Sequence, residues 1–376
     1  MSRERAYRIL ILGGYGHFGS RIAQALATRE DCHLLIAGRD ESRARKAAAR
    51  LRESGAVSVE GTQLDAGCGE LSQRIRQHRV DLLIHTAGPF QQQSYHVARA
   101  CIDAGVNYID LADGREFVAG IGAMDAAARE RGVLVVSGAS TLPALSAAVV
   151  DHYREQFGAI ASIDIGITPG NHTPRGVSTV AAVLSYCGKA FDRWQNARWE
   201  TVHGWQDLHR FHYPRLGSRW LASCDVPDLA LFPQRYQVRE RVTFHAGLEL
   251  SAMQLSLWLM SWLTRWKLVR SWTPAARVLK AASDRVITLG TDAGGMHVEI
   301  AGVDPSGKPR QILWLLTALG GDGPKIPCIA AIVLARKLAD GKLARTGAQA
   351  CVDLMTLEDF AAAVSGLAIE WEERVM

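Results

Sequence analysis

The sequence lacks the motifs of several common enzyme classes. It contains no Tyr-x-x-x-Lys pair, the usual acid of short-chain reductases, and no Gly-x-Ser-x-Gly elbow of a serine hydrolase. Its seven cysteines are odd in number, far apart and without a Cys-x-x-Cys pair, which favours reduced thiols inside a cell. His203, His209 and His212 form the only tight histidine cluster, but no carboxylate or cysteine stands at metal-ligand spacing, so we predict no metal site.

Signals for export, membrane spanning and nucleic-acid binding are missing as well. Residues 1–5 carry both charge signs and lead straight into a short apolar run, unlike a secretory signal, so we expect a cytoplasmic protein. The uncharged segment Leu250 to Thr264 has fifteen residues, fewer than the roughly twenty that a spanning helix needs. The net charge of +5 is spread among nearly as many acids, with no basic run, so we expect no nucleic-acid partner.

What the sequence does contain is a regular alternation of strand and helix patterns. Its 376 residues leave room for two domains, and 48% hydrophobic with 22% charged residues is typical of a folded chain. Alternating βαβ units predict a Rossmann-type, doubly wound parallel sheet of α/β class. The six predicted strands are Ile9–Leu12, Leu34–Ala37, Val57–Leu64, Val80–His85, Tyr108–Leu111 and Val133–Val136.

The pattern changes after about residue 142. We therefore predict an NADP-binding domain over residues 1–142 and a second, mixed α/β (α+β) domain over 143–325 for substrate binding and dimerisation. The second domain includes a Trp-rich helical segment, and eight of the ten tryptophans lie between Trp194 and Trp272. C-terminal helices are expected over 326–376, roughly Ile326–Asp340 and Leu357–Ser365, packing back on either domain.

A glycine-rich segment follows the first predicted strand. In Gly14-Tyr15-Gly16-His17-Phe18-Gly19 the spacing Gly-x-Gly-x-x-Gly stands between a strand and a helix-compatible run, as in dinucleotide-binding folds. The first glycine permits a tight turn, the second lets a pyrophosphate approach bare backbone, and the third lets the helix sit close to the strand. Backbone N–H groups at the helix N-terminus then face the phosphates.

The end of the second predicted strand distinguishes NADP from NAD. Gly38 and Arg39 stand where NAD-binding proteins usually carry a carboxylate, and a guanidinium suits a 2′-phosphate, so we predict NADP. The alternative is that Arg39 is a solvated residue beside a helix N-cap at Asp40. Asp65 is either an adenine-side contact or a turn residue. Ala87-Gly88-Pro89, after the fourth strand, is expected near the nicotinamide.

These segments, with Cys101-Ile102-Asp103-Ala104-Gly105-Val106-Asn107-Tyr108-Ile109-Asp110, resemble the saccharopine dehydrogenase-like NADP-binding family over about the first 140 residues. The resemblance implies an NADP-linked oxidoreductase whose substrate sits between the Rossmann domain and a second mixed domain. The chain departs from the best-known member in its shorter length and its Trp-rich stretch.

Catalytic candidates follow from position. Asp110 and Asp113 come after the fifth predicted strand, His85 and Thr86 after the fourth, and Arg175 in a Pro/Gly turn could pair with a substrate carboxylate. Of these, Asp113, His85 and Arg175 are the predicted catalytic residues. The alternatives are a solvated loop charge for the aspartates and Arg175, and a satisfied buried histidine for His85. We expect an NADP(H)-dependent oxidoreductase acting on a C=N or C=O carbon of an amino-acid-like or other small substrate. The alternative is a non-catalytic NADP-binding sensor that docks on a partner or a membrane.

Trp258, Trp262 and Trp266 recur every four residues and share one face of a predicted helix, followed by Arg265, Lys267 and Arg270. This face is a core or homodimer contact, an interfacial membrane contact through residues 250–270, or a lining for an apolar substrate.

Overall fold

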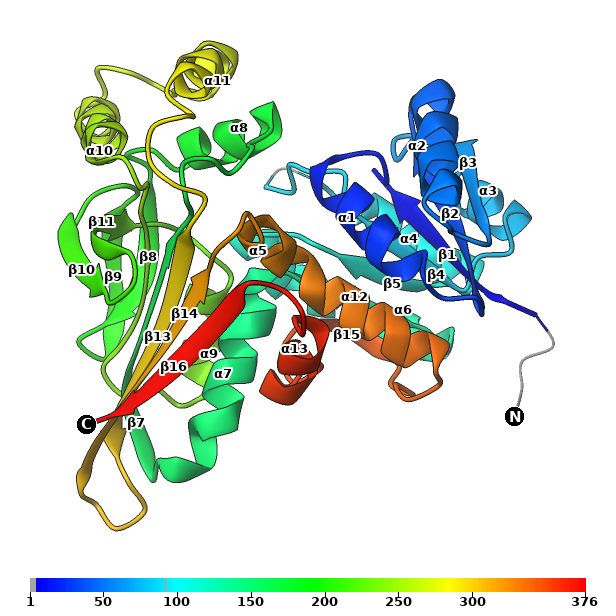
Figure 1. The fold of residues 1–376 in the computed structure, drawn as a ribbon. Helices are drawn as coiled ribbons and strands as arrows, with labels where there is room; N and C mark the ends of the chain where they lie inside the picture. Colours follow the sequence, from blue (N-terminus) through cyan, green and yellow to red (C-terminus); the bar gives the residue numbers. More distant parts are fainter. Residues whose placement is uncertain (1–4, 92) are drawn as a thin grey trace. The chain divides into compact units, whose positions relative to one another are not determined.

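The computed structural model describes residues 5–91 and 93–376, which form two compact units. Unit 1 comprises the chain up to Leu145 together with Lys325–Ala363, and unit 2 comprises Ser146–Pro324 together with Val364–Met376. Each unit is thus built from two separate stretches of the chain. The predicted ranges 1–142, 143–325 and 326–376 follow one another and do not include this exchange of segments. Figure 1 follows the chain by colour through both units.

Unit 1 is a seven-stranded, all-parallel sheet with helices on both faces. Across the sheet the strands are β3 (Val59–Gln63), β2 (Cys32–Gly38), β1 (Tyr7–Leu12), β4 (Leu82–His85), β5 (Asn107–Asp110), β6 (Leu134–Ser137) and β15 (Gly347–Ala350). Its helices are α1 (His17–Leu26), α2 (Glu41–Glu53), α3 (Leu71–Gln77), α4 (His96–Ala104), α5 (Arg115–Ala119), α6 (Asp125–Glu130), α12 (Ile326–Ala339) and α13 (Leu357–Ala363).

The apolar strands of unit 1 are buried on both faces, as a doubly wound sheet requires. Leu10 and Leu12 of β1 belong to the same core cluster as Leu71 of α3 and Val97 of α4. The alternate side chains of β1 are equally buried, and helices α1 and α12 pack against each other. The strand order 3-2-1-4-5-6 reverses direction between β1 and β4, which makes this the switch point of the sheet.

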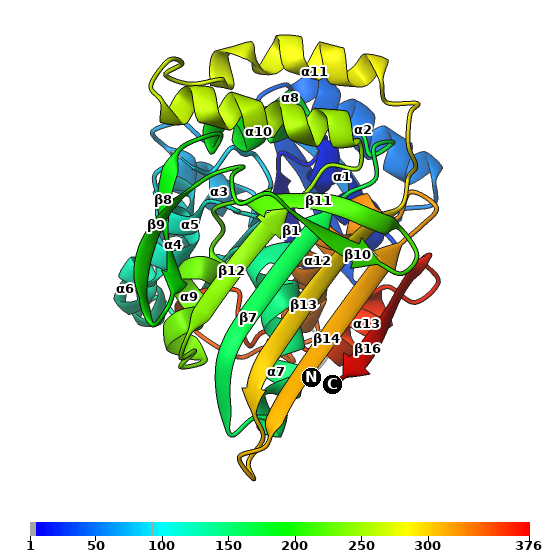
Figure 2. The ribbon, with the colours of Figure 1, turned by 90° about the vertical axis from the view of Figure 1, so that its left-hand side faces the viewer.

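Unit 2 is built on a mixed seven-stranded sheet, seen face-on in Figure 2. Across the sheet the strands are β10 (His209–Tyr213), β11 (Gly217–Ser223), β12 (Arg241–Ala246), β7 (Ala159–Thr168), β13 (Gly294–Val303), β14 (Pro309–Ala318) and β16 (Ile369–Val375). A separate hairpin pairs β8 (Ala190–Gln195) with β9 (Arg198–His203). The helices are α7 (Ser146–Tyr153), α8 (Val177–Ser185), α9 (Asp228–Arg235), α10 (Ser251–Arg265) and α11 (Ala276–Arg285).

The predicted fold class, a Rossmann-type sheet with a second mixed domain, is therefore confirmed. The C-terminal region differs from the all-helical expectation, because β15 and β16 are strands. Ile369-Glu370-Trp371-Glu372 alternates apolar and acidic residues with the period of two that belongs to a strand, and β16 pairs with β14. None of the helices in the described residues combines the length and apolarity needed to cross a bilayer.

Candidate cofactor site at the switch point of unit 1

The glycine turn joins β1 directly to α1. Gly13 adopts a left-handed φ of +84°, and its N–H donates to the Ala37 carbonyl at 2.8 Å, which fixes the turn against β2. The Gly16 N–H donates to the Gly13 carbonyl at 2.8 Å and closes the bend. The N-cap of α1 is Gly16, and no side chain caps the helix there. The first N–H groups of α1 are therefore available to an anion.

Two glycines of the fingerprint are needed because other atoms occupy the space of a side chain. A Cβ on Gly19 would lie 2.4 Å from the Gly13 carbonyl oxygen and 2.7 Å from Thr86 Oγ1, and one on Gly14 would lie 2.8 Å from the Ile11 carbonyl oxygen. A Cβ on Gly16 would meet only the Gly13 carbonyl oxygen, at 3.0 Å. Gly14 and Gly19 therefore serve the turn itself, whereas Gly16 leaves its outer side open.

The space at Gly38 is filled by the ring of Tyr15. A Cβ on Gly38 would lie 2.5 Å from Tyr15 Cε1 and from its hydroxyl oxygen. The Tyr15 hydroxyl accepts a hydrogen bond from the Asp40 N–H at 3.1 Å. The glycine turn and the end of β2 are thus locked together by one aromatic side chain.

Two guanidinium groups stand at this junction. Arg39 is exposed, and within the described residues its guanidinium makes no hydrogen bond or ion pair; only its carbonyl is engaged, by Gln63 Nε2 at 3.0 Å. The Arg43 guanidinium lies over the Tyr15 ring, 4.6 Å from its centroid. Asp40 caps α2 by accepting from the Arg43 N–H at 3.0 Å, so the nearest carboxylate is engaged by the helix. Asp40 is the N-cap that the alternative interpretation names, and a contact of the exposed Arg39 with a 2′-phosphate stays a prediction.

Sequence reasoning missed Arg43. A signal was present, because a cation in the first turn of a helix opposes the helix dipole and is normally disfavoured there. An anion bound beside Arg43 would remove this penalty. Arg39 and Arg43 are therefore our candidates for binding a 2′-phosphate.

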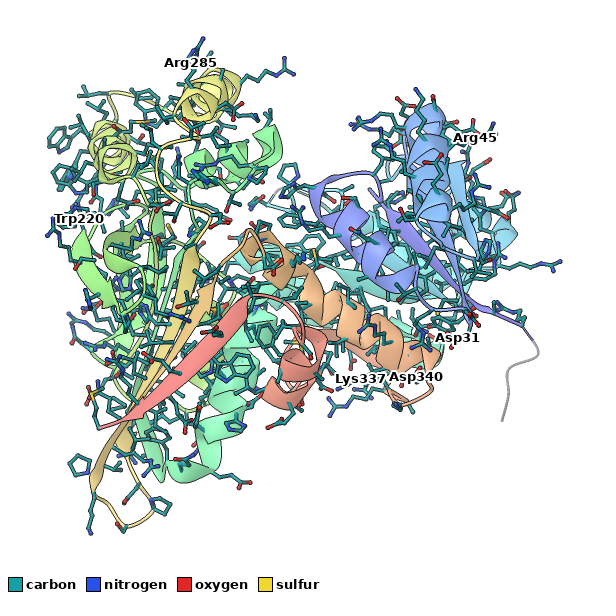
Figure 3. The ribbon with its side chains drawn as sticks, in the orientation of Figure 1. Asp31, Arg45, Trp220, Arg285, Lys337 and Asp340 are labelled. Atoms are coloured by element: carbon teal, nitrogen blue, oxygen red, sulfur yellow. The ribbon has the colours of Figure 1, made fainter. Side chains whose placement is uncertain are left out.

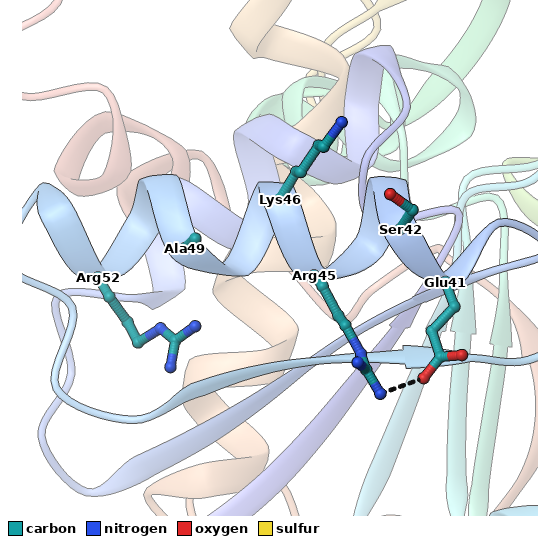
Figure 4. Close-up of a pocket in the computed structure, with 6 residues that line it drawn as sticks. All are labelled: Glu41, Ser42, Arg45, Lys46, Ala49 and Arg52. Carbon is teal, nitrogen blue, oxygen red and sulfur yellow. Dashed lines mark hydrogen bonds and ion pairs between the residues drawn. The ribbon is translucent and has the colours of Figure 1, made fainter.

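A hollow on α2 does not belong to this site. It is lined by Glu41, Ser42, Arg45, Lys46, Ala49 and Arg52, all from that helix (Figure 4). Glu41 and Arg45 form an ion pair at 2.6 Å. No residue of the glycine turn contributes to the lining. We assign it no role in holding the cofactor.

The loop after β4 runs beside the glycine turn. Thr86 donates from its N–H and from Oγ1 to the Leu12 carbonyl, at 2.8 and 3.0 Å. Gln93 Nε2 donates to the carbonyls of Ala87 and Pro89, at 2.9 and 2.8 Å, and the Gly88–Pro89 peptide bond is cis. Ala87, Gly88 and Pro89 are thereby held at the same sheet edge as the glycines. Gln93 is a second residue that sequence reasoning missed.

Asp65 acts as a turn residue in the structure. Its exposed side chain accepts from the Gly67 N–H at 3.0 Å, and its carbonyl accepts from Cys68 N–H. This is the turn interpretation offered by the sequence, and an adenine contact by the other carboxylate oxygen stays a prediction.

His85 is placed inside the core rather than on the surface of the site. Its side chain is 1% exposed, its Nδ1 lies 3.1 Å from the Tyr108 hydroxyl, and its ring packs edge-on against Phe90. Burial lowers the pKa of His85 to about 4. A neutral, enclosed imidazole is poorly suited to deliver a proton to a substrate, so the structure disfavours the predicted role.

The two aspartates after β5 have different surroundings. Asp110 is fully buried, and its Oδ1 accepts from the N–H groups of Ala112 and Gly138 and from the Ser137 hydroxyl. Burial raises the pKa of Asp110 to about 6, against the effect of those hydrogen bonds. Asp113 is exposed and accepts from Gln91 Nε2 at 3.0 Å, which brings it to the loop after β4. Asp113 is the aspartate that a bound molecule can reach.

Arg175 belongs to unit 2, where a partly buried hydrogen-bond network holds it. Its Nη2 donates to the carbonyl and the side-chain oxygen of Asn171, at 2.7 and 2.9 Å. The Asn171 amide donates in turn to the carbonyls of Val286 and Leu289, both at 2.7 Å. Nε donates weakly to the Thr173 carbonyl at 3.5 Å, so one edge of the guanidinium is engaged, while Nη1 makes no hydrogen bond within the described residues.

Unit 2 also gathers titratable groups that the sequence did not predict as a cluster. Asp164 Oδ1 lies 3.3 Å from His245 Nδ1 and 3.6 Å from His297 Nε2, and the Tyr213 hydroxyl lies 2.9 Å from His297 Nδ1. Although burial opposes it, the two histidines hold the pKa of Asp164 well below its ordinary value. A Cβ on Gly166 would lie 2.2 Å from His297 Cε1, so this glycine makes room for the ring. No group of three or more His, Cys, Asp or Glu in residues 5–91 and 93–376 is arranged to hold a metal ion.

Taken together, the strand order, the glycine turn at the switch point and the exposed Arg39 at the end of β2 define a Rossmann dinucleotide-binding protein. Residues 9–155 match the family described as the saccharopine dehydrogenase NADP binding domain. The resemblance inferred from the sequence is confirmed over this segment, and the cofactor of the matching domain is the predicted NADP.

Comparison with solved structures extends the likeness of fold along the whole chain. Saccharopine dehydrogenase (L-Glu forming) from Saccharomyces cerevisiae aligns over 99% of this chain and 100% of its own, with a TM-score of 0.68 and 13% identity. Amine dehydrogenase from Mycobacterium smegmatis aligns over 93% and 96%, with 10% identity and a TM-score of 0.48. GenD2 from gentamicin A biosynthesis, solved with NAD, aligns over 97% and 93%, with 14% identity and a TM-score of 0.43. Of these three, the first establishes a shared fold.

A search of curated protein sequences finds no match.

Proposed function

We propose that the protein is an NADP(H)-dependent oxidoreductase of the saccharopine dehydrogenase-like type. It transfers a hydride to or from a C=N or C=O carbon of an amino-acid-like or other small substrate. The observation that carries the proposal is the junction of the glycine turn with β2, where the Arg39 guanidinium has no partner among the described residues and the Arg43 guanidinium lies over the Tyr15 ring. A cytoplasmic location and a homodimer stay predictions from the sequence.

Some of these residues bind the cofactor or the substrate, and one transfers a proton. The N–H groups at the start of α1 bind the pyrophosphate, Arg39 and Arg43 bind the 2′-phosphate, and the loop of Ala87 to Pro89 borders the nicotinamide. The bound cofactor supplies the hydride chemistry. Asp113, exposed and oriented by Gln91, is our candidate for the proton, and Arg175 Nη1 is our candidate for a substrate carboxylate.

A non-catalytic NADP sensor is the alternative. Steady oxidation of NADPH with any member of a panel of amines and keto acids supports the enzyme. Tight NADPH binding with no turnover across that panel supports the sensor.

The Arg39→Ala variant tests the cofactor assignment. We expect the parent to bind NADPH at least tenfold more tightly than NADH, a difference of about 1.4 kcal/mol or more, and the variant to lose most of this preference. The reason is that a 2′-phosphate loses its bidentate partner whereas a 2′-hydroxyl loses little. Isothermal titration with both cofactors measures the effect.

Two further variants sharpen the result. Arg43→Ala should reduce the same preference in part, since it removes the second cation at the junction. Arg52→Ala, on the hollow of α2, serves as the matched control and should leave both affinities unchanged. Equal NADPH and NADH affinity in the parent would refute the assignment of Arg39.

A further inference from the structure

Helix α10 buries three polar side chains together with one leucine, Leu257, and exposes two other leucines. Gln254 and Ser261 are 0% exposed, and Thr264 is also buried. On the opposite face Leu255 and Leu259 are exposed, the latter to 57%. The exposed apolar side chains continue past the helix end with Trp266 at 62% and Leu268 at 69%. We call Leu255, Leu259, Trp266 and Leu268 the apolar stripe.

The buried polar face has a packing reason, so the exposed apolar stripe is not a by-product of a loose fit. Gly188, with φ +68°, lies so close to α10 that a Cβ on it would be 2.2 Å from the Ser261 carbonyl oxygen and 2.7 Å from Thr264 Cβ. Such close approach requires small side chains on the helix. Gln254 Oε1 accepts from the Leu248 N–H at 2.9 Å, so its buried carbonyl is satisfied.

The segment that carries the stripe is rich in positive charge. Residues 250–290 contain six Lys or Arg and one Asp, a net charge of +5, as large as that of the whole chain. Lys280 pairs with Asp284 at 2.5 Å. Lys267, Arg270, Arg277 and Arg285 are exposed and have no carboxylate partner in the described part of the chain. Helices α10 and α11 lie at one end of unit 2 (Figures 1 and 2), and Figure 3 shows Arg285 at the outer end of this region.

We propose that the apolar stripe and these four cations form a docking surface for an anionic lipid bilayer. Exposed Trp and Leu beside Lys and Arg suit a helix lying in the plane of a membrane interface, where the apolar face enters the acyl boundary and the cations meet lipid phosphates. No described helix is long enough to span, so the contact is peripheral.

A second copy of the chain fits this surface less well. In a two-fold dimer the same patch contacts itself, which would bring two clusters of net +5 together. A nucleic acid would satisfy the cations but would leave the apolar stripe without a function. Of these three partners, an anionic bilayer is therefore the one that matches both the cations and the apolar stripe.

Flotation of the full-length protein with vesicles tests the proposal. Vesicles of phosphatidylcholine alone are compared with vesicles in which phosphatidylglycerol replaces about a third of the lipid. We expect binding only to the anionic vesicles, weakening with salt, and a partition coefficient at least tenfold lower for W266S/L268S. K267E/R270E should lower it by roughly fivefold or more for each cation reversed. V57S, at an exposed apolar residue of unit 1, is the matched control and should bind like the parent.

The folded state of each variant is checked by its NADPH affinity and melting temperature, which should match the parent. The proposal is overturned if the parent ignores anionic vesicles, or if both double variants bind them as the parent does. It is equally overturned if W266S/L268S converts a solution dimer to a monomer while the parent shows no vesicle binding, since the stripe then belongs to a second copy.

Discussion

Gly19→Ala is expected to abolish NADPH binding, with at least a hundredfold loss of affinity, about 2.7 kcal/mol. The added methyl group would lie 2.4 Å from the Gly13 carbonyl oxygen, 2.7 Å from Thr86 Oγ1 and 2.8 Å from Gly14 Cα. Two of these neighbours are backbone atoms of the turn, so α1 must move away from β1. Its free N–H groups then no longer point at the pyrophosphate. Titration of the purified variant with NADPH measures the loss.

The Gly16→Ala variant is expected to weaken cofactor binding while leaving the fold intact. Its Cβ would meet only the Gly13 carbonyl oxygen, at 3.0 Å, so the turn should survive with a small shift. We expect near-parental melting but strongly weakened NADPH binding, because the methyl group stands where the pyrophosphate approaches bare backbone. Gly122→Ala is the matched control, with no atom within 4 Å of its Cβ, and should retain full affinity. Unchanged binding in Gly16→Ala would contradict the placement of the diphosphate.

The sheet of unit 1 could be predicted because its strands are apolar on both faces. Apolar runs such as Ile9–Leu12 and Val133–Val136, alternating with helix patterns, are typical of strands in a parallel sheet that is buried on both faces, and the structure places β1 and β6 there. β15, with the sequence Gly-Ala-Gln-Ala, carries no such signal. It becomes a strand by pairing with β6, a contact with a segment more than two hundred residues away.

The cofactor site could be predicted only in part. The tight turn requires glycine, so the sequence alone predicts it. The role of a side chain depends on which residues the fold places next to it, and the sequence does not show this. Arg43 gains its place from the Tyr15 ring, and Asp113 gains its orientation from Gln91. The sequence offered His85 as a catalytic residue or a buried histidine from its position at a strand end, but that position does not show the edge-on contact of its ring with Phe90. The tryptophan periodicity of α10 was visible, but its buried polar face was not.

The stability of unit 2 is expected to fall as pH rises from 5 to 8, relative to an Asp228→Asn variant. Asp228, at the start of α9, is fully buried; Ser146 donates to its Oδ1, and its Oδ2 has no partner within the described residues. Burial raises the pKa of Asp228 to about 7, partly offset by the Ser146 hydrogen bond. Between the unfolded and folded pKa values the folded state binds the extra proton, so stability decreases with pH until the folded pKa is passed. The loss should be about 3 kcal/mol over this window.

Tryptophan fluorescence during urea unfolding measures this change in the right unit, because all ten tryptophans lie in unit 2. Asn at position 228 cannot ionise but still accepts from Ser146, so its stability should vary less with pH. Burial also lowers the pKa of other groups of unit 2, such as His209, and these groups affect parent and variant alike. The difference between the two curves therefore isolates Asp228. Glu240→Gln, at an exposed residue, is the control, and its stability should vary with pH as that of the parent does. Parallel curves of stability against pH for the parent and Asp228→Asn would contradict a raised pKa of Asp228.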